Sequence, residues 1–229
     1  MKPKLYKSLN RIVSKQVVIA EYTQSSQSPQ EFQKAKWGSE ASMLNRFRLG
    51  LDQLQWNQTR KWLDVGCGTG KFFSVVEDSG RCFELLMGVD IVPELVDQAE
   101  KRCLNSVAKF LATDMDDLPM GLQDFDVVSL VGVLQRCGLS PHRMLRLCVE
   151  RLKSDGQLFL TTKHIGWRAF SEGEKSPEPS HSWFDYAELE EIISALGVRI
   201  VSAGGFLPRE NVVVPLKDSH TMFIVGRKE

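Results

Sequence analysis

The chain has 229 residues, of which 29 are basic and 29 are acidic, so its formal net charge is zero. This balance provides no overall field that would favour nucleic acid or an anionic membrane as a partner, and the length suits one α/β domain with an accessory segment. The five cysteines include no C-x-x-C pair, which argues against a zinc site and a disulfide framework. The longest apolar stretch, around residues 127–134, is too short to span a membrane. We therefore expect a cytoplasmic protein.

The first 56 residues are predicted to form a helical cap, or lid, ahead of the sheet domain. Residues 1–24 place apolar side chains at helical spacing and basic side chains on the opposite side. That basic side is either a docking surface for an acidic partner or a solvated face. A capping box at residues 28–31 and the pair Ser39-Glu40 predict two further helices.

Residues 61–90 contain the pattern around which the rest of the chain is organised. A short apolar strand at 62–65 runs into a glycine-rich turn at 66–70, a helix follows over 71–79, and a second strand ends at Asp90. Alternate glycines let the backbone turn tightly and leave no side chain between it and a ligand. An acid at the end of the second strand can accept hydrogen bonds from both ribose hydroxyls, so this unit predicts a nucleoside-binding site.

Strands and helices continue to alternate beyond this unit. Further strands are predicted, in chain order, at 108–113, 125–133, 157–162, 198–203 and 221–226. This alternation predicts an α/β fold with a doubly wound, mostly parallel sheet in a domain at residues 57–229. Residues 164–182 lose all periodicity, which predicts a long variable loop beside the carboxyl edge of the sheet, on the substrate side.

The glycine spacing separates two classes of cofactor. The dinucleotide fingerprint G-x-G-x-x-G needs a glycine where this chain has Lys71, which disfavours an NAD-binding oxidoreductase. The loop is instead D-x-G-x-G-x-G, formed by Asp64, Gly66, Gly68 and Gly70. It resembles motif I of the class I S-adenosylmethionine (SAM) methyltransferases. In that family the loop packs against the amino-acid end of the cofactor, and the leading aspartate helps to fix the loop.

The resemblance covers about residues 37–229 and is nearest to the small-molecule branch that includes the ubiquinone-biosynthesis O-methyltransferases. Residues 45–50 (Asn-Arg-Phe-Arg-Leu-Gly) and 180–189 resemble two segments of that branch. The resemblance implies a seven-stranded Rossmann-like sheet, with SAM as cofactor and S-adenosylhomocysteine as product. In that branch an arginine of the first segment holds the cofactor carboxylate. Arg48 takes that position, and Arg46 is the alternative.

The resemblance also implies roles for individual cofactor-binding residues. Asp90 would bind the ribose and Ile91 would pack on the adenine, while Asp114 would accept a hydrogen bond from the adenine amine. Alternatively, Asp90 and Asp114 cap a helix and a turn, and Arg48 is a surface arginine. The full predicted set is Arg48, Asp64, Gly66, Cys67, Gly68, Gly70, Asp90, Ile91, Asp114, Met115 and Val131.

Catalysis of methyl transfer, an in-line displacement, depends mostly on how nucleophile and sulfonium are positioned. A hydroxyl acceptor also needs a base within hydrogen-bond reach, and His181 is the predicted base. Tyr22 and Trp37 of the cap, with His164 at the start of the variable loop, are predicted to line the substrate pocket. The alternatives are solvated histidines and a tryptophan that anchors two helices.

One segment departs from the ubiquinone branch. Those enzymes carry acidic and histidine residues just after the fourth strand, where a divalent metal can organise a catechol, whereas residues 132–136 are Gly-Val-Leu-Gln-Arg. The prediction is therefore transfer of a methyl group to an O or N nucleophile of a small molecule, without a metal. A tRNA or protein methyltransferase and a non-catalytic SAM-binding module are the alternatives, and the oligomeric state is left open.

Overall fold

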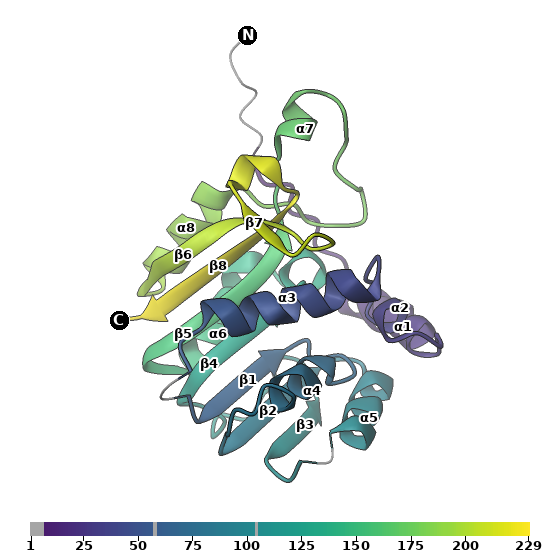
Figure 1. The fold of residues 1–229 in the computed structure, drawn as a ribbon, viewed down its shortest axis with the longest axis vertical. Coiled ribbons are helices and arrows are strands. Elements are labelled where there is room, and N and C mark those ends of the chain that lie inside the picture. The colour runs from purple at the N-terminus through teal and green to yellow at the C-terminus, as the bar shows by residue number, and fades with distance from the viewer. Residues whose placement is uncertain (1–6, 57–58, 104) are drawn as a thin grey trace.

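The computed structural model describes residues 7–56, 59–103 and 105–229, and within these residues eight strands form one twisted sheet (Figure 1). The strand order is β3-β2-β1-β4-β5-β8-β6-β7. Neighbouring strands from β3 to β5 pair in parallel, and β8, β6 and β7 continue the sheet with antiparallel pairs. The strands are β1 (Lys61–Val65), β2 (Leu85–Asp90), β3 (Ala108–Ala112), β4 (Phe125–Val131), β5 (Leu152–Lys163), β6 (Val198–Leu207), β7 (Val212–Val214) and β8 (Thr221–Lys228).

The α/β class and the mostly parallel, Rossmann-like sheet are confirmed, but the predicted count of seven strands is wrong. The additional strand, β7, has three residues and pairs antiparallel with β6. It lies between Pro208 and Pro215, in the stretch between the strands predicted at 198–203 and 221–226. A strand this short, flanked by prolines, has too few residues to show an alternating pattern.

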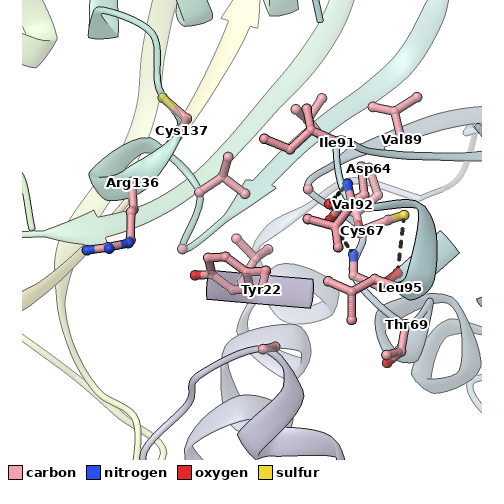
Figure 2. A pocket seen from close by; sticks show the side chains of 18 of the residues that line it. Tyr22, Asp64, Cys67, Thr69, Val89, Ile91, Val92, Leu95, Arg136 and Cys137 are labelled. Carbon is pink, nitrogen blue, oxygen red and sulfur yellow. Dashed lines mark hydrogen bonds between the residues drawn. The ribbon is translucent and has the colours of Figure 1, made fainter. Parts of the chain in front are cut away.

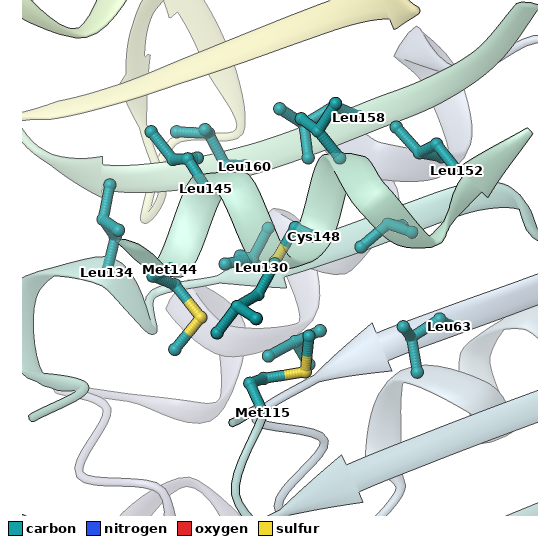
Figure 3. Close-up of a cluster of buried hydrophobic side chains, with 14 of the residues drawn as sticks. Leu63, Met115, Leu130, Leu134, Met144, Leu145, Cys148, Leu152, Leu158 and Leu160 are labelled. Atoms are coloured by element: carbon teal, nitrogen blue, oxygen red, sulfur yellow. The ribbon is translucent and has the colours of Figure 1, made fainter. Parts of the chain in front are cut away.

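Helices cover both faces of the sheet. The helices are α1 (Lys15–Ser26), α2 (Glu31–Lys34), α3 (Glu40–Gln53), α4 (Lys71–Glu77), α5 (Pro93–Arg102), α6 (Pro141–Arg151), α7 (Arg168–Ser171) and α8 (Tyr186–Ala195), with 3-10 turns η1 (Leu134–Arg136) and η2 (Leu216–Asp218). Alternate residues of each strand point to opposite faces, which produces two core clusters. On β5, Leu158 and Leu160 belong to the cluster covered by α6 and α8 (Figure 3), while Phe159 belongs to the cluster covered by α3 and α4.

The N-terminal helix is shorter than predicted. It begins at Lys15, because the Ser14 side chain caps it by accepting a hydrogen bond from the backbone N–H of Val17. Leu9 instead pairs with Trp183, and the two residues exchange backbone hydrogen bonds of 2.7 and 3.0 Å. The first six residues of the predicted helix lie outside the described part of the chain. The segment before α1, around Leu9, therefore runs alongside residues 182–185. We call this segment the strap.

Helix α3 shares the core of the sheet domain. Its buried residues Met43, Phe47 and Leu49 join the cluster around Phe159. At Gly50 a Cβ would lie 2.8 Å from Cε1 of Phe159, so the helix backbone rests almost directly on the sheet. The division of the chain at residue 56 stays a prediction. No helix in the described ranges is long and apolar enough to cross a membrane.

Replacing Phe159 by alanine should lower the free energy of unfolding by about 3–5 kcal/mol, because a fully buried aromatic ring is lost under α3. Urea unfolding of the purified chain measures this. Val213→Ala is the matched control, because Val213 is 50% exposed on β7, and its effect should stay within about 0.5 kcal/mol. Similar decreases in the free energy of unfolding in the two variants would contradict the packing described for α3.

Candidate functional site

A cavity opens at the carboxyl edge of the parallel strands, under α1 and the segment that leads into α3 (Figure 2). It contains about 1030 Å³ of empty space, including the open solvent at its mouth. Its lining comes from the ends of four parallel strands and from the N-terminal cap. The polar or charged side chains among the lining residues are Tyr22, Asp64, Thr69, Lys71, Asp90, Thr113, Asp114 and Arg136, and the predicted residues Trp37, Gly66, Cys67, Gly68, Ile91, Met115 and Val131 also line it.

The glycine loop is fixed against the end of β2. The backbone N–H groups of Gly66 and Cys67 both donate to the carbonyl of Val89, over 2.8 and 3.0 Å. Gly68 has a φ of +52°, and a Cβ built there would meet no atom within 4 Å. Gly70 does not line the cavity, because a Cβ there would lie 3.0 Å from the Ala99 Cβ of α5. The loop therefore presents bare backbone to the cavity at Gly68, and Gly70 serves packing.

Asp90 is held by the loop that it faces. Its Oδ2 accepts a hydrogen bond from the Gly68 N–H (2.9 Å), and its Oδ1 accepts one from the Val92 N–H (3.0 Å). Burial raises the pKa of Asp90 to about 6, although these N–H donors act in the opposite direction. Each carboxylate oxygen keeps a further lone pair for a ligand. The end of β2 thus offers an oriented acceptor beside the loop.

Asp64 is the most deeply enclosed acid of the cavity. The Ser129 hydroxyl donates to its Oδ1 over 2.5 Å, and the indole N–H of Trp62 donates to the same hydroxyl over 2.8 Å. Burial, with a smaller contribution from the charge of Asp90, raises the pKa of Asp64 to about 7, although the hydrogen bond from Ser129 acts in the opposite direction. This chain of hydrogen bonds ties β1 to β4 beneath the glycine loop.

Asp114 connects the cavity to the N-terminal helix. It follows β3, and its Oδ1 accepts a hydrogen bond from the Asp116 N–H over 3.0 Å. The ammonium group of Lys15, in the first turn of α1, lies 2.7 Å from its Oδ2. Hydrogen bonding to Asp114 is the largest cause of the raised pKa of Lys15. The ion pair holds α1 across the carboxyl end of the sheet.

Tyr22 and Arg136 form the side of the cavity opposite the glycine loop (Figure 2). Burial raises the pKa of Tyr22 to about 12, so its phenol keeps its proton at neutral pH. Arg136 donates from Nη1 to the Ser180 carbonyl over 2.5 Å and pairs with the Glu21 carboxylate. Neither Arg136 nor Lys71 was among the predicted site residues. The signal for both was positional, since each is a cation directly after a predicted strand or loop of the site.

Besides Gly70, three predicted residues lie outside the lining of the cavity: Arg48, His164 and His181. Arg48 is exposed and donates to the Asn45 side chain over 3.0 Å. Arg46 lies two residues earlier, which places it on the opposite side of the helix, and it is the buried one of the pair, with 7% exposure. The helical phase, which the local motif does not specify, therefore turns Arg48 to solvent.

The two histidines also belong to other contacts. His164 is buried, with its Nδ1 3.0 Å from the Leu216 carbonyl, so it ties the end of β5 to the turn before β8. His181 has its Nδ1 3.2 Å from a Glu178 carboxylate oxygen. Burial lowers the pKa of both rings. Neither histidine is among the residues that line the cavity.

Within residues 7–56, 59–103 and 105–229, no group of three His, Cys, Asp or Glu side chains is arranged to hold a metal ion. The acids of the cavity are instead spaced along three strand ends, at Asp64, Asp90 and Asp114. Carboxylates at the ends of parallel strands, beside a bare glycine loop, suit hydrogen-bond donors on a nucleoside. The site can therefore bind a ribose and a base in extended form along the sheet edge.

Comparison with known proteins gives a consistent picture. Residues 63–160 match the model of the methyltransferase domain family. A ubiquinone biosynthesis O-methyltransferase of Coxiella burnetii (strain Dugway 5J108-111) is 30% identical over 112 residues, which cover 47% of this chain and 45% of the relative. The chain thus spans about half the length of this curated relative.

Two solved structures show how widely the fold is shared. The [4+2]-cyclase SpnF superposes with a TM-score of 0.68 at 17% identity, covering 97% of this chain and 99% of its own. The N-methyltransferase NodS from Bradyrhizobium japonicum, in complex with S-adenosylhomocysteine, gives a TM-score of 0.60 at 16% identity, covering 92% and 97%. At these identities the likeness concerns the fold alone.

The raised pKa values of Asp64 and Asp90 predict how stability depends on pH. The folded state binds the protons of these two carboxyl groups more tightly than the unfolded chain does. The free energy of unfolding should therefore fall as the pH rises above about 4. The contribution of Asp90 is lost as the pH approaches 6, and that of Asp64 as it approaches 7. Each proton contributes up to about 1.4 kcal/mol per pH unit. In urea unfolding between pH 4.5 and 7, the free energy of unfolding of Asp64→Asn should decrease less with rising pH than that of the wild type. The control Asp52→Asn, at an exposed position of α3, should behave like the wild type. An identical pH slope in wild type and Asp64→Asn is the contrary outcome.

Proposed function

We propose that this chain, of which residues 63–160 match the methyltransferase domain family, is a class I SAM-dependent methyltransferase that transfers a methyl group from SAM to an oxygen or nitrogen of a small molecule. The observation that carries the proposal is the carboxylate of Asp90, which faces the cavity at the end of β2 and is oriented by the Gly68 N–H. A ribose with two hydroxyl donors is the ligand that such an acceptor suits.

The strand ends fit a nucleoside in a definite order. Asp90 accepts from the ribose hydroxyls, and Ile91 and Met115 provide the apolar walls for the adenine. Asp114 accepts from the adenine amine, because its ion pair with Lys15 leaves carboxylate lone pairs free. Val131, at the end of β4, forms the floor below the sulfonium. We propose these roles for the predicted residues that line the cavity.

The amino-acid end of the cofactor belongs at the glycine loop, where the backbone of Gly66, Cys67 and Gly68 is bare or tightly turned. A carboxylate there needs a cation. Lys71 and Arg136 are the basic side chains of the described lining, and Lys71 is the one beside the loop. We therefore propose Lys71 for the role that the family resemblance assigned to Arg48.

Bound SAM supplies an electrophilic methyl group: the lone pair of the acceptor forms the new bond to carbon as the carbon–sulfur bond breaks, and S-adenosylhomocysteine leaves. The chain's part is to align the acceptor with that bond and to exclude water. Tyr22 keeps its proton at neutral pH, so it orients the acceptor by donating a hydrogen bond and does not act as a base. His181 lies outside the lining, so the acceptor proton goes to solvent in this proposal.

A small-molecule acceptor is supported by the curated relative, which is named as an O-methyltransferase. The balanced charge of the chain gives no support to an RNA substrate. All five cysteines are free thiols, which suits the cytoplasm as the place of action.

Calorimetric titration of SAM, S-adenosylhomocysteine and NAD into the purified chain tests the cofactor. Micromolar binding of the first two alone is expected. Release of S-adenosylhomocysteine during incubation with fractionated metabolite extracts then tests transfer. Tight SAM binding without turnover in any fraction would support a non-catalytic module or another reaction on this fold, as the cyclase neighbour illustrates, and would overturn methyl transfer.

Asp90→Asn should weaken SAM binding at least tenfold, because an amide presents one acceptor oxygen and a donor where the ribose hydroxyls need two acceptors. The matched control is Asp97→Asn, at an exposed position of α5, with unchanged affinity expected. Calorimetry measures both, and thermal unfolding verifies that both variants are folded. Equal affinities in Asp90→Asn and wild type would remove Asp90 from the ribose site.

A further inference from the structure

A buried cation without an acidic partner lies at the carboxyl end of β5. Arg46 of α3 donates from Nη1 to the carbonyl (2.7 Å) and hydroxyl (2.6 Å) of Ser42, and from Nη2 to Thr221 Oγ1 (3.3 Å). These bonds occupy at most three of its five N–H groups. Its pKa is lowered to about 10 by burial, and no carboxylate in the described part of the chain offsets this. Such a charge is costly unless an anion neutralises it.

A second cation lies beside the first. Lys163 and Thr221 are cross-strand partners on β5 and β8, which places the lysine next to the hydroxyl that Arg46 contacts. Its side chain is 18% exposed, and its ammonium lies 5.0 Å from the ring centroid of Trp183. Its acidic neighbour is Glu178, at 3.5 Å, whose side chain is 58% exposed. A pair this long and this exposed compensates little of the local positive charge.

A neutral donor completes the group. Thr161 precedes Lys163 by two residues and therefore points to the same face of the sheet. Its hydroxyl is buried and has no hydrogen-bond partner among the residues that the structure describes. Thr161 pairs with Val131, which lines the cavity, and adjacent strands are about 4.8 Å apart. The unpartnered hydroxyl of Thr161 thus lies with the cations of Arg46 and Lys163 about one strand beyond the floor of the cavity.

Trp37 forms the wall between the cavity and these donors. It lines the cavity, and the guanidinium of Arg46 lies 4.5 Å from its ring centroid. A Cβ at Gly132 would lie 2.2 Å from Cη2 of the same ring, so the absence of a side chain at this position lets the ring pack against the end of β4. Arg46, Lys163 and Thr161 do not line the cavity, so a ligand must displace this ring or enter beside Lys163 to reach them.

His220 adds no charge at neutral pH. Burial, together with the charges of Lys163, Arg46 and Arg209, lowers its pKa to about 4. The region therefore contains two buried or half-buried cations against the exposed carboxylate of Glu178. Its net charge is positive although the whole chain is neutral. A region of this kind favours an anionic ligand.

We propose that Arg46, Lys163 and Thr161 bind an oxyanion of the methyl acceptor, so that the acceptor is a small molecule with a carboxylate or a phosphate monoester. The guanidinium and the hydroxyl donate hydrogen bonds to the oxyanion, and the ammonium pairs with its charge. The inference rests on the proposed function, because it names the class of that acceptor. It requires the nucleophile to lie within about one strand spacing of the oxyanion.

Benzoate, phenyl phosphate and the neutral benzamide are suitable probes. Each is titrated by calorimetry at constant ionic strength into the full chain saturated with S-adenosylhomocysteine. One of the two anions should bind at least tenfold more tightly than benzamide, and the stronger one identifies the oxyanion. Equal binding of benzamide, or no binding of either anion, would overturn the proposal.

Variants test whether the anion binds at the cluster of Arg46, Lys163 and Thr161. Lys163→Gln and Arg46→Met should each weaken anion binding at least tenfold without changing the affinity for S-adenosylhomocysteine, whereas Lys109→Gln, at an exposed position of β3, should change neither. Arg46→Met should also keep or raise the melting temperature, because it removes an uncompensated buried charge. Anion binding retained in both cluster variants would show that the cations serve the fold alone.

The two proposals fail separately. If S-adenosylhomocysteine does not bind, the proposed function is lost, and the anion titration is repeated on the chain without it. Anion binding that depends on Arg46 and Lys163 would then still support an oxyanion site. Cofactor binding with anion affinities equal in wild type, Lys163→Gln and Arg46→Met would leave the proposed function standing and remove this inference.

Discussion

The geometry of the cavity depends on the hydrogen bonds between Asp90 and the backbone at its two sides. One carboxylate oxygen accepts from the loop after β1 and the other from the start of α5, so the acid joins two segments that are 24 residues apart (Gly68 to Val92). Without these donors a buried carboxylate would be strongly destabilised. The loop and the acid therefore form one unit, and a ligand that binds Asp90 meets a receptor already in place.

The opposite ends of the cavity differ in charge. Asp64, Asp90 and Asp114 line the cavity along the ends of β1, β2 and β3, while Arg136 lines it beyond β4. Arg46 and Lys163 lie outside the lining, behind Trp37. In the proposed complex the positive sulfonium and the adenine amine face the acidic end, and the acceptor oxyanion faces the basic end. This complementarity orients both ligands along the sheet edge before any bond forms.

What the sequence could predict was local. The strand, glycine turn and acid of residues 62–90 lie on one short stretch, and their pattern was sufficient to predict residues that line the cavity. Arg48 was misplaced because the phase of α3 is set by packing on Phe159, which is over 100 residues away. The strap at Leu9 was likewise missed, since its partner is Trp183 and pairing between distant segments leaves no local periodicity.

The same long-range contacts bear on the choice of substrate. The strap binds residues 182–185, Arg136 donates to the Ser180 carbonyl, and Lys15 binds Asp114, so the N-terminal cap and the variable loop 164–182 are tied to each other and to the sheet edge. The strand ends that face the proposed cofactor belong to the part matched by the family model, whereas these ties mostly involve residues outside it. Because a cyclase and an N-methyltransferase share the fold, the reacting partner must be selected by such added segments. The basic cluster under Trp37, built from α3, β5 and β8, is the feature of this chain most suited to that selection.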